Sequence, residues 1–336
     1  MVSFRYKLAA GLQARGVRVC DGLNDPPYDA VLVIGGTKRL GALWRLRRDG
    51  IPIVQRLDGM NWLHRLRRKT TGTGWRHFTR AEYGNFILST IRARLASHVV
   101  YQSEFVRGWW ERARGSTPVP STVIYNGVDL ASYTPVGPQS PPHDRYRVLL
   151  VEGSLMGGYE QGLQVAVDLA RKLADEHRIG DDRPVELMVL GRVAAELRSK
   201  FDNLLESCPG ASLAWVGLVP REHIPDFDRA AHILFSADIN AACPNSVIEA
   251  LGCGLPVVSF DTGALPELVK GDAGRLAPYG GDPWQLDDPD VGALAQAVVE
   301  VLHDQDRFCA AARERAKEAF NLETMVEKYL EVIKGF

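Results

Sequence analysis

The chain has 336 residues, of which 46% are hydrophobic and 24% charged, a composition typical of a globular protein. This length exceeds one typical hydrophobic core, so two domains of roughly 150 residues each are expected. The sequence holds no run of about 18 apolar residues, which excludes a membrane-spanning helix. Met1 leads directly into an amphipathic pattern, so no secretory signal is expected either.

Charge is distributed unevenly along the chain. Residues 1–135 carry 21 Lys and Arg against 9 Asp and Glu, whereas residues 136–336 carry 19 against 32. Opposite charges favour association of the two halves, and the basic half would attract anionic partners. The five cysteines are scattered and form no Cys-x-x-Cys pair, which favours a reducing, cytoplasmic compartment and no structural metal.

The first half alternates predicted helices and strands. Phe4, Leu8 and Leu12 predict an opening helix that ends at Gly16. Strands are expected at 17–20, 30–34, 51–57 and 99–103, a strand followed by a turn at 121–129, and helices at 37–46, 62–69, 87–96 and 104–114. This alternation indicates a parallel sheet with helices on both faces. Open α/β domains usually begin with a strand and none precedes Phe4, so a first strand is expected to be missing.

The second half repeats the pattern after a proline-rich segment. We expect a first domain at 1–135, a linker at 136–145 and a second domain at 146–315. A helix at 316–336 is expected to pack back on the first domain. Strands of the second domain are predicted at 146–151, 185–190, 213–216, 233–236 and 256–260.

The stretch 241–266 reads as loop, helix, tight turn and buried strand. Asn245 or Ser246 can cap the helix, and Gly252 and Gly254 end it. The free N–H groups at such a helix start are a natural seat for a phosphate or another anion. About one turn inside the helix, Glu249 could accept hydrogen bonds from sugar hydroxyls. The alternative is a solvated glutamate on an ordinary capped helix.

Two features of the first half allow two readings each. Ligands of parallel sheets bind beyond the carboxyl ends of the strands, where Arg56 and Asp58 lie. These two residues either pair structurally or, with their neighbours, contact an acceptor. Residues 62–69 form a basic amphipathic stretch, which either lies on an anionic membrane surface or is a solvated helix face.

Four segments carry recognisable motifs: 102–106, 123–129, 243–251 and 261–269. Together they resemble the S-x-F-V, V-I-x-N-G-V-D, C-P-N and G-G-x-P-E-L-V segments of the GT-B glycosyltransferases, in particular of the retaining, glycogen-synthase-like group 4 family. The resemblance implies an α/β fold of the GT-B type, with two doubly wound, Rossmann-like domains facing a cleft.

The resemblance also implies a reaction: transfer of a hexose from a UDP- or GDP-linked sugar to a glycan or lipid-linked acceptor, with retention and without a metal or other cofactor. No motif for nucleic-acid binding is present, and the protein would be cytoplasmic or peripheral on the inner face of the cell membrane. The candidate donor-binding residues are Gly153, Ser154, Gly157, Gly158, Gly191, Arg192, Gly217, Asn245, Ser246, Val247 and Glu249. The candidate acceptor-binding residues are Arg56, Asp58, Asn61 and Ser103, and Asp58 and Glu249 are the catalytic candidates.

Three features depart from the family pattern. The family often has a second glutamate where this chain has Ala241, and the missing first strand removes its N-terminal glycine loop. Segment 151–162 lacks the Arg and Lys that clamp the diphosphate in the family. At roughly 1.5–3 kcal/mol per charged hydrogen bond, their absence should reduce the stabilisation of the leaving group by several kcal/mol. A nest of N–H groups from Gly153 to Gly158, or the Arg192 guanidinium, could replace them. A non-catalytic GT-B binding protein is therefore the alternative, whereas an NAD-dependent enzyme is disfavoured because no Gly-x-Gly-x-x-Gly follows a first strand.

Overall fold

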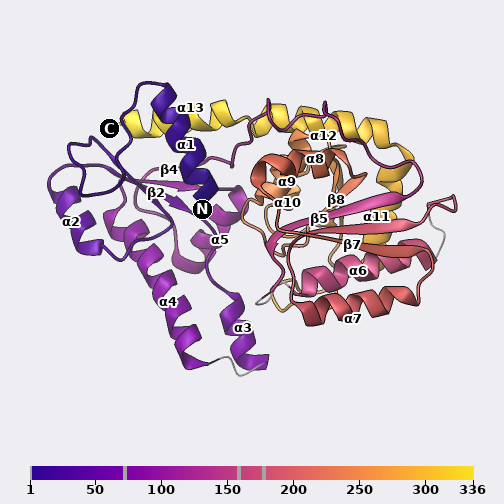
Figure 1. Ribbon diagram of the computed structural model, residues 1–336. Helices are drawn as coiled ribbons and strands as arrows, with labels where there is room; N and C mark the ends of the chain where they lie inside the picture. The colour runs from indigo at the N-terminus through magenta and orange to yellow at the C-terminus, as the bar shows by residue number, and fades with distance from the viewer. Residues whose placement is uncertain (1, 71–73, 157–159, 176–178) are drawn as a thin grey trace. The chain divides into compact units, whose positions relative to one another are not determined.

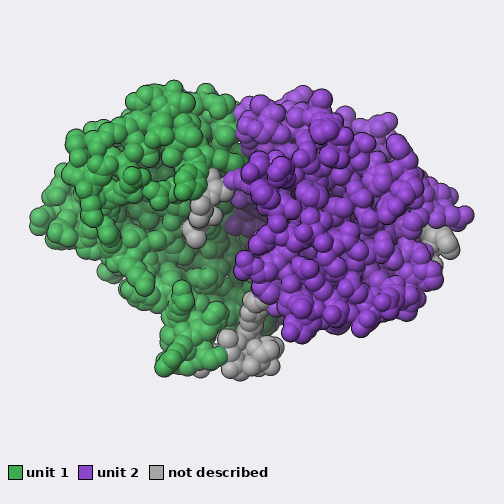
Figure 2. All heavy atoms as spheres, viewed as in Figure 1, with its two compact units in different colours: residues 1–127, 322–336 green, residues 128–321 purple. Residues whose placement is uncertain are grey.

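The computed structural model describes residues 2–70, 74–156, 160–175 and 179–336. The chain divides into two compact units, which Figure 2 colours separately. Unit 1 consists of Met1–Gly127 together with Leu322–Phe336, and unit 2 of Val128–Asn321. The chain therefore leaves unit 1 just before the proline-rich segment and returns to it for its last helix.

Unit 1 is built on a four-stranded parallel sheet in the order β1-β2-β3-β4 (Figure 1). The strands are β1 (Val31–Ile34), β2 (Ile53–Leu57), β3 (His98–Tyr101) and β4 (Ser121–Val123). The helices are α1 (Val2–Ala14), α2 (Leu40–Arg48), α3 (Leu63–Thr70), α4 (Trp75–Thr90), α5 (Glu104–Arg114) and α13 (Leu322–Lys334), and a π-helical turn, η1 (Ile91–Leu95), continues α4.

The last helix of the chain is part of the unit 1 core. Phe4, Leu8 and Leu12 of α1 pack with Val326 and Tyr329 of α13 over one face of the sheet. The rings of Phe4 and Tyr329 meet edge to face at 5.3 Å. A Cβ at Gly11 would lie 2.5 Å from Val326 Cγ2, so glycine lets the two helices approach closely. The other face is covered from α2, α4 and η1, chiefly by Leu43, Ile87, Ile91 and Leu95.

Unit 2 contains a six-stranded parallel sheet in the order β10-β9-β8-β5-β6-β7. Its strands are β5 (Tyr146–Ser154), β6 (Val185–Arg192), β7 (Ala211–Gly217), β8 (Ile233–Phe235), β9 (Val257–Phe260) and β10 (Gly274–Ala277). The chain runs outward from β5 through β6 to β7, then returns to β8 on the other side of β5. The strand order thus reverses between β5 and β8, which is where such sheets bind ligands.

Helices cover both faces of the unit 2 sheet (Figure 1). One face carries α6 (Glu160–Asp175), α7 (Ala195–Glu206) and α11 (Val291–His303), and the other carries α8 (Ile224–Arg229), α9 (Asn245–Gly252) and α12 (Gln305–Ala319). Two short helical segments, η2 (Arg221–His223) and α10 (Leu265–Leu268), lie in the connections. No helix in the described part of the chain is long and apolar enough to cross a bilayer.

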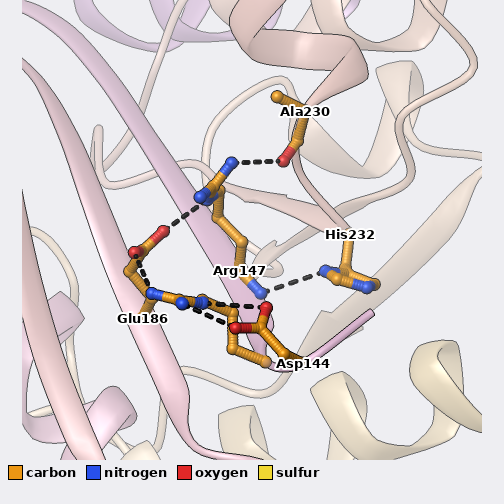
Figure 3. Close-up of polar contacts among 6 residues, drawn as sticks. Asp144, Arg147, Glu186, Ala230 and His232 are labelled. Atoms are coloured by element: carbon orange, nitrogen blue, oxygen red, sulfur yellow. Dashed lines mark hydrogen bonds and ion pairs between the residues drawn. The ribbon is translucent and has the colours of Figure 1, made fainter. Parts of the chain in front are cut away.

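A polar network holds the amino ends of β5 and β6 together (Figure 3). Arg147 pairs with Glu186 on the neighbouring strand and donates to the carbonyl oxygen of Ala230 at 3.0 Å. The Arg147 backbone N–H donates to His232 Nδ1 at 3.0 Å. Burial and the charges of Arg183 and Arg147 lower the pKa of His232 to about 4, so this imidazole is neutral and able to accept. This charged network therefore lies at the amino edge of the sheet, opposite to its carboxyl edge.

The prediction of two parallel, Rossmann-like α/β domains is confirmed, but three local predictions are wrong. Residues 17–20 form no strand, because Val17 and Val19 pack against the α1–α13 core without a ladder partner. The helix predicted from residue 87 begins at Trp75, since exposed aromatic side chains obscure the amphipathic pattern of its first turns. Strand β10 was missed because it begins at Gly274, where a Cβ would lie 1.9 Å from Val257 O.

Candidate functional site

The carboxyl edge of the unit 2 sheet gathers most of the predicted donor-binding residues. Strand β5 ends at Ser154, β6 at Arg192 and β7 at Gly217. Gly191 has a φ of 144°, and a Cβ there would lie 2.0 Å from Glu152 O, so only glycine lets β6 stay paired with β5. The Leu155 N–H donates to Arg192 O at 2.9 Å, which extends this pairing beyond the strand end.

The predicted glycine nest is corrected in its first part. Gly153 and Ser154 continue β5 as extended, exposed strand, with Ser154 opposite Arg192. A nest needs alternating left- and right-handed residues, which an extended strand lacks. Gly157 and Gly158 lie outside the described residues. The Arg192 side chain is exposed and has no hydrogen-bond or ion-pair partner in the described part of the chain, so its guanidinium is available to an anion.

Two carboxyl groups that the sequence interpretation missed lie at the same edge. Glu152 is near the end of β5, and Asp238 follows the neighbouring strand β8. Burial, and secondarily the charge of Asp238, raises the pKa of Glu152 to about 8. Burial raises the pKa of Asp238 to about 6. Where the family pattern predicts two cations, this edge therefore presents two partly protonated acids. The sequence does show an acidic residue here, because Glu152 lies in segment 151–162, which lacks the Arg and Lys of the family pattern.

Helix α9 begins at Asn245, and no side chain caps it. The predicted capping by Asn245 or Ser246 is therefore wrong: Pro244 occupies the N-cap in an extended conformation, and Asn245 is already helical. Asn245 is exposed and Ser246 half-buried, whereas the Val247 side chain is buried. The helix ends at Gly252, and Gly254 has a φ of 72°, so the predicted glycine stop is confirmed.

Glu249 is 7% exposed, which excludes a solvated glutamate. Its Oε1 accepts a hydrogen bond from Arg221 Nη2 at 2.5 Å, and Arg221 stands in the turn η2 that follows β7. Tyr133 faces the same pair, and its pKa is raised by burial and by the charge of Glu249. A buried carboxylate requires such a partner, because desolvating it alone would be costly. Glu249 is thus fixed by Arg221 at the base of α9, and its predicted contact with a ribose stays a prediction.

A buried alanine, Ala241, occupies the position of the family's second glutamate. Ala241 is 2% exposed, and its carbonyl oxygen accepts from the Ala264 N–H at 2.9 Å. Gly263 has a φ of 62°, and a Cβ there would lie 2.5 Å from Ala241 N. The loop before α9 therefore packs on the loop after β9 where the family pattern has a carboxylate.

In unit 1, the structure favours one of the two readings of Arg56. This residue is 2% exposed, and its guanidinium donates to Asp58 Oδ1 at 2.9 Å and to Asn126 Oδ1 at 2.6 Å. Arg56 therefore pairs structurally and is not placed to contact an acceptor. Gln102 donates to the same carboxylate oxygen of Asp58, whose side chain is 35% exposed. Asp58 is thus oriented by two donors while remaining accessible.

The two remaining acceptor candidates differ in their surroundings. Ser103 is fully buried, and its hydroxyl accepts the Val106 N–H at 3.2 Å as the N-cap of α5. Its predicted acceptor contact is replaced by this structural role. Asn61 is exposed, and its backbone N–H donates to Asn85 Oδ1 at 2.9 Å. Across the described residues, no three His, Cys, Asp or Glu side chains converge in a way that could hold a metal ion.

The chain folds into two doubly wound α/β units, and comparison with known proteins shows which fold this is. Residues 146–304 match the family model described as "Glycosyl transferases group 1". WaaG, a glycosyltransferase involved in lipopolysaccharide biosynthesis, superposes with a TM-score of 0.68 at 14% identity, over 99% of this chain and 96% of that chain. Anabaena HepE in complex with UDP and glucose superposes with a TM-score of 0.65 at 17% identity, over 92% and 78%. The chain therefore has the GT-B glycosyltransferase fold, and the recognition of that fold is confirmed; membership of group 4 stays a prediction.

The curated relatives match this chain over only part of its length and part of their own length. The alpha-maltose-1-phosphate synthase of Mycolicibacterium smegmatis is 25% identical over 224 residues, which are 63% of this chain and 56% of that protein. The lipopolysaccharide core biosynthesis mannosyltransferase LpsB of Rhizobium meliloti is 26% identical over 214 residues, 58% and 54% respectively. The chain thus spans about half the length of these two relatives.

Glu152 gives the stability of the protein a characteristic pH dependence. Between its unfolded pKa near ~4.3 and its folded pKa of about 8, the folded state holds a proton that the unfolded state has lost. The free energy of unfolding should therefore fall as pH rises through this window. Glu152→Gln stays neutral and should remove that fall, which amounts to about 4 kcal/mol between pH 5 and pH 8.5 at about 1.4 kcal/mol per pH unit. Urea unfolding at pH 5, 7 and 8.5 measures it.

The exposed Glu196 on α7 provides the matched control, and Glu196→Gln should leave the pH profile unchanged. Parallel profiles for the wild type and Glu152→Gln would contradict the raised pKa.

Proposed function

We propose that this chain is a glycosyltransferase that moves a hexose from a UDP- or GDP-linked sugar to a glycan or lipid-linked acceptor. The observation that carries the proposal is the unit 2 strand edge, where Arg192, the start of α9 and the Arg221–Glu249 pair lie within the residues that match the family model. The names of the two relatives describe a synthase and a mannosyltransferase, and HepE has been solved with UDP and with UDP-glucose. These findings support a nucleotide-sugar donor.

The donor diphosphate would bind between the end of β6 and the start of α9. The Arg192 guanidinium and the free N–H groups of the first turn of α9 would stabilise the charge that develops on the leaving diphosphate. Because these hydrogen-bond donors can stabilise the leaving diphosphate, a metal ion is not needed for that purpose. We propose that the reaction proceeds without one. Glu249 would accept the ribose hydroxyls, oriented by Arg221. Ionised Glu152 and Asp238 would repel the diphosphate, so binding should be tighter below pH 8.

Asp58 is the candidate group for the acceptor. Its carboxylate is accessible, and Arg56 and Gln102 fix its orientation. It would accept a hydrogen bond from the acceptor hydroxyl and hold that hydroxyl for transfer. We propose that the transfer retains the anomeric configuration of the donor. The configuration of the first-formed product, read by proton NMR, tests this.

One observation favours the alternative, a GT-B protein that binds nucleotides without transfer. The carboxyl ends of β5, β6 and β8 carry two acids and Arg192, not the Arg and Lys pair of the family pattern. Loss of leaving-group stabilisation would reduce turnover more than binding, because the charge develops only during reaction. Nucleotide binding without hydrolysis or transfer over a panel of donors would support this alternative.

Calorimetric titration with UDP and GDP tests the proposal directly. One of the two nucleotides should bind equally well in Mg²⁺ and in EDTA, and more tightly at pH 6.5 than at pH 8.5. Arg192→Gln should weaken binding about tenfold or more, because a charge-assisted hydrogen bond contributes roughly 1.5–3 kcal/mol. Lys270→Gln is the matched control, since this exposed cation precedes β10 at the opposite edge of the sheet. If a folded wild-type protein binds neither nucleotide, the proposal fails.

We also propose that unit 1 contacts an anionic membrane surface, where a lipid-linked acceptor would be found. In addition to the basic sequence of α3, helix α4 exposes Trp75, Tyr83 and Phe86, with Arg76 and Arg80 exposed beside them. Aromatic side chains enter the headgroup region, and each basic residue adds about 1 kcal/mol near anionic lipid.

Sedimentation with lipid vesicles tests the membrane contact. The protein should bind vesicles containing phosphatidylglycerol at low salt, and should not bind phosphatidylcholine vesicles. Trp75→Ser should reduce binding severalfold, whereas Trp44→Ser, which changes another exposed indole, on α2, should not. Equal loss in both variants, or no binding to anionic vesicles, would overturn the proposed contact.

A further inference from the structure

A pocket of about 200 Å³ lies within unit 1 beside the loop that follows β2. Its walls come from this loop and from helices α3, α4 and α5, and they include Asn61, Trp62, Arg65, Asn85, Trp109 and Arg114. Neither Arg56 nor Asp58 lines it. The pocket is therefore separate from the candidate acceptor carboxylate.

The walls of this pocket are held in place before any ligand arrives. Asn85 is fully buried; its Oδ1 accepts the Asn61 N–H and its Nδ2 donates to Asn61 O, both at 2.9 Å. A Cβ at Gly59 would lie 2.4 Å from Trp109 Cζ3, so the loop presses on that indole. Arg65 is fixed by Glu82 through two hydrogen bonds of 2.6 and 3.0 Å. A preorganised pocket loses little conformational entropy on binding.

The size and lining of the pocket restrict its ligand. Pockets for drug-sized ligands measure roughly 300–1,000 Å³, so about 200 Å³ accommodates a single sugar ring and not a nucleotide sugar. The indoles of Trp62 and Trp109 are half-buried, and their rings add apolar surface to the pocket. The exposed amide of Asn61 can both donate to and accept from hydroxyl groups. This combination suits a hexose ring.

The charge of the pocket points to an anion. None of its lining residues is acidic. Arg65 is neutralised by Glu82, but the exposed Arg114 has no hydrogen-bond or ion-pair partner within the described ranges. Arg114 is the last residue of α5, and the buried Arg92 donates to the adjacent Gly115 O at 2.7 Å, which compensates the negative end of the helix. A guanidinium fork matches the two oxygens of a carboxylate or a phosphate.

We propose that this pocket binds one anionic sugar residue of the acceptor, either a uronic acid or a phosphorylated hexose. The inference rests on the proposed function, since a glycan acceptor is what would bring such a residue to unit 1. The indoles bind the ring, Asn61 binds hydroxyl groups, and Arg114 binds the anionic group. The pocket thereby selects acceptors through a sugar unit of the acceptor that does not itself react.

Ligand-observed NMR and quenching of tryptophan fluorescence test the inference, with methyl glucuronide, glucose 6-phosphate, methyl glucoside and inorganic phosphate as probes. At least one anionic sugar should bind about tenfold more tightly than both the neutral glucoside and free phosphate, and which one binds identifies the anionic group. Arg114→Gln should remove this advantage. Arg112→Gln, which changes an exposed arginine in the same helical turn, should retain it. Trp62→Leu should weaken binding of every sugar.

Three results would overturn the inference: no sugar binding, equal binding of the neutral glucoside, or equal binding of phosphate alone. Thermal melts establish that each variant is folded. Nucleotide titration of the same samples keeps the two proposals apart. Intact UDP or GDP binding without sugar binding rejects this pocket alone, whereas sugar binding without nucleotide binding rejects the proposed transferase.

Discussion

The parallel pairing of β5 with both β6 and β8 is the constraint on which the candidate site depends. Because all strands of this sheet run the same way, their carboxyl ends meet at one edge, and the reversal of strand order leaves space beside β5 for a ligand. Arg192, Asp238 and the start of α9 belong to separate stretches of sequence and come to this edge through that pairing. Gly191 permits it, because any larger residue would collide with Glu152 O.

The electrostatics of this edge distinguish the chain from the pattern that its motifs resemble. A diphosphate needs positive charge, whereas the carboxyl edge of this sheet carries Glu152 and Asp238, whose pKa values are raised by burial. Protonated carboxyl groups can donate to phosphate oxygens, whereas ionised ones repel them. If a diphosphate binds here as proposed, its affinity would depend on pH more strongly than with an Arg and Lys clamp. The Arg221–Glu249 pair does not contribute to this effect, because the opposite charges of its two side chains compensate each other.

Much of the fold could be predicted from the sequence, because parallel strands and glycine stops leave local signals. Helix α5 was predicted with its observed bounds, and the strand positions of unit 2 were correct except for β10. Contacts between distant residues leave no such signal. The burial of Arg56 against Asn126 and Phe4, and the capping role of Ser103, depend on tertiary packing. The sequence shows a carboxyl group at Glu152, but its raised pKa could not be predicted, since it arises from burial in the fold and from Asp238, which is distant in sequence.

We propose that the carboxyl edge of the unit 2 sheet holds a nucleotide diphosphate. A crystal structure of the protein grown with UDP or GDP at pH 6.5 would show where the nucleotide binds. We expect the diphosphate at the ends of β5 and β6, within hydrogen-bonding distance of Arg192 and the first N–H groups of α9, and the ribose next to Glu249. A nucleotide bound elsewhere, or one whose phosphates contact neither Arg192 nor α9, would contradict the account.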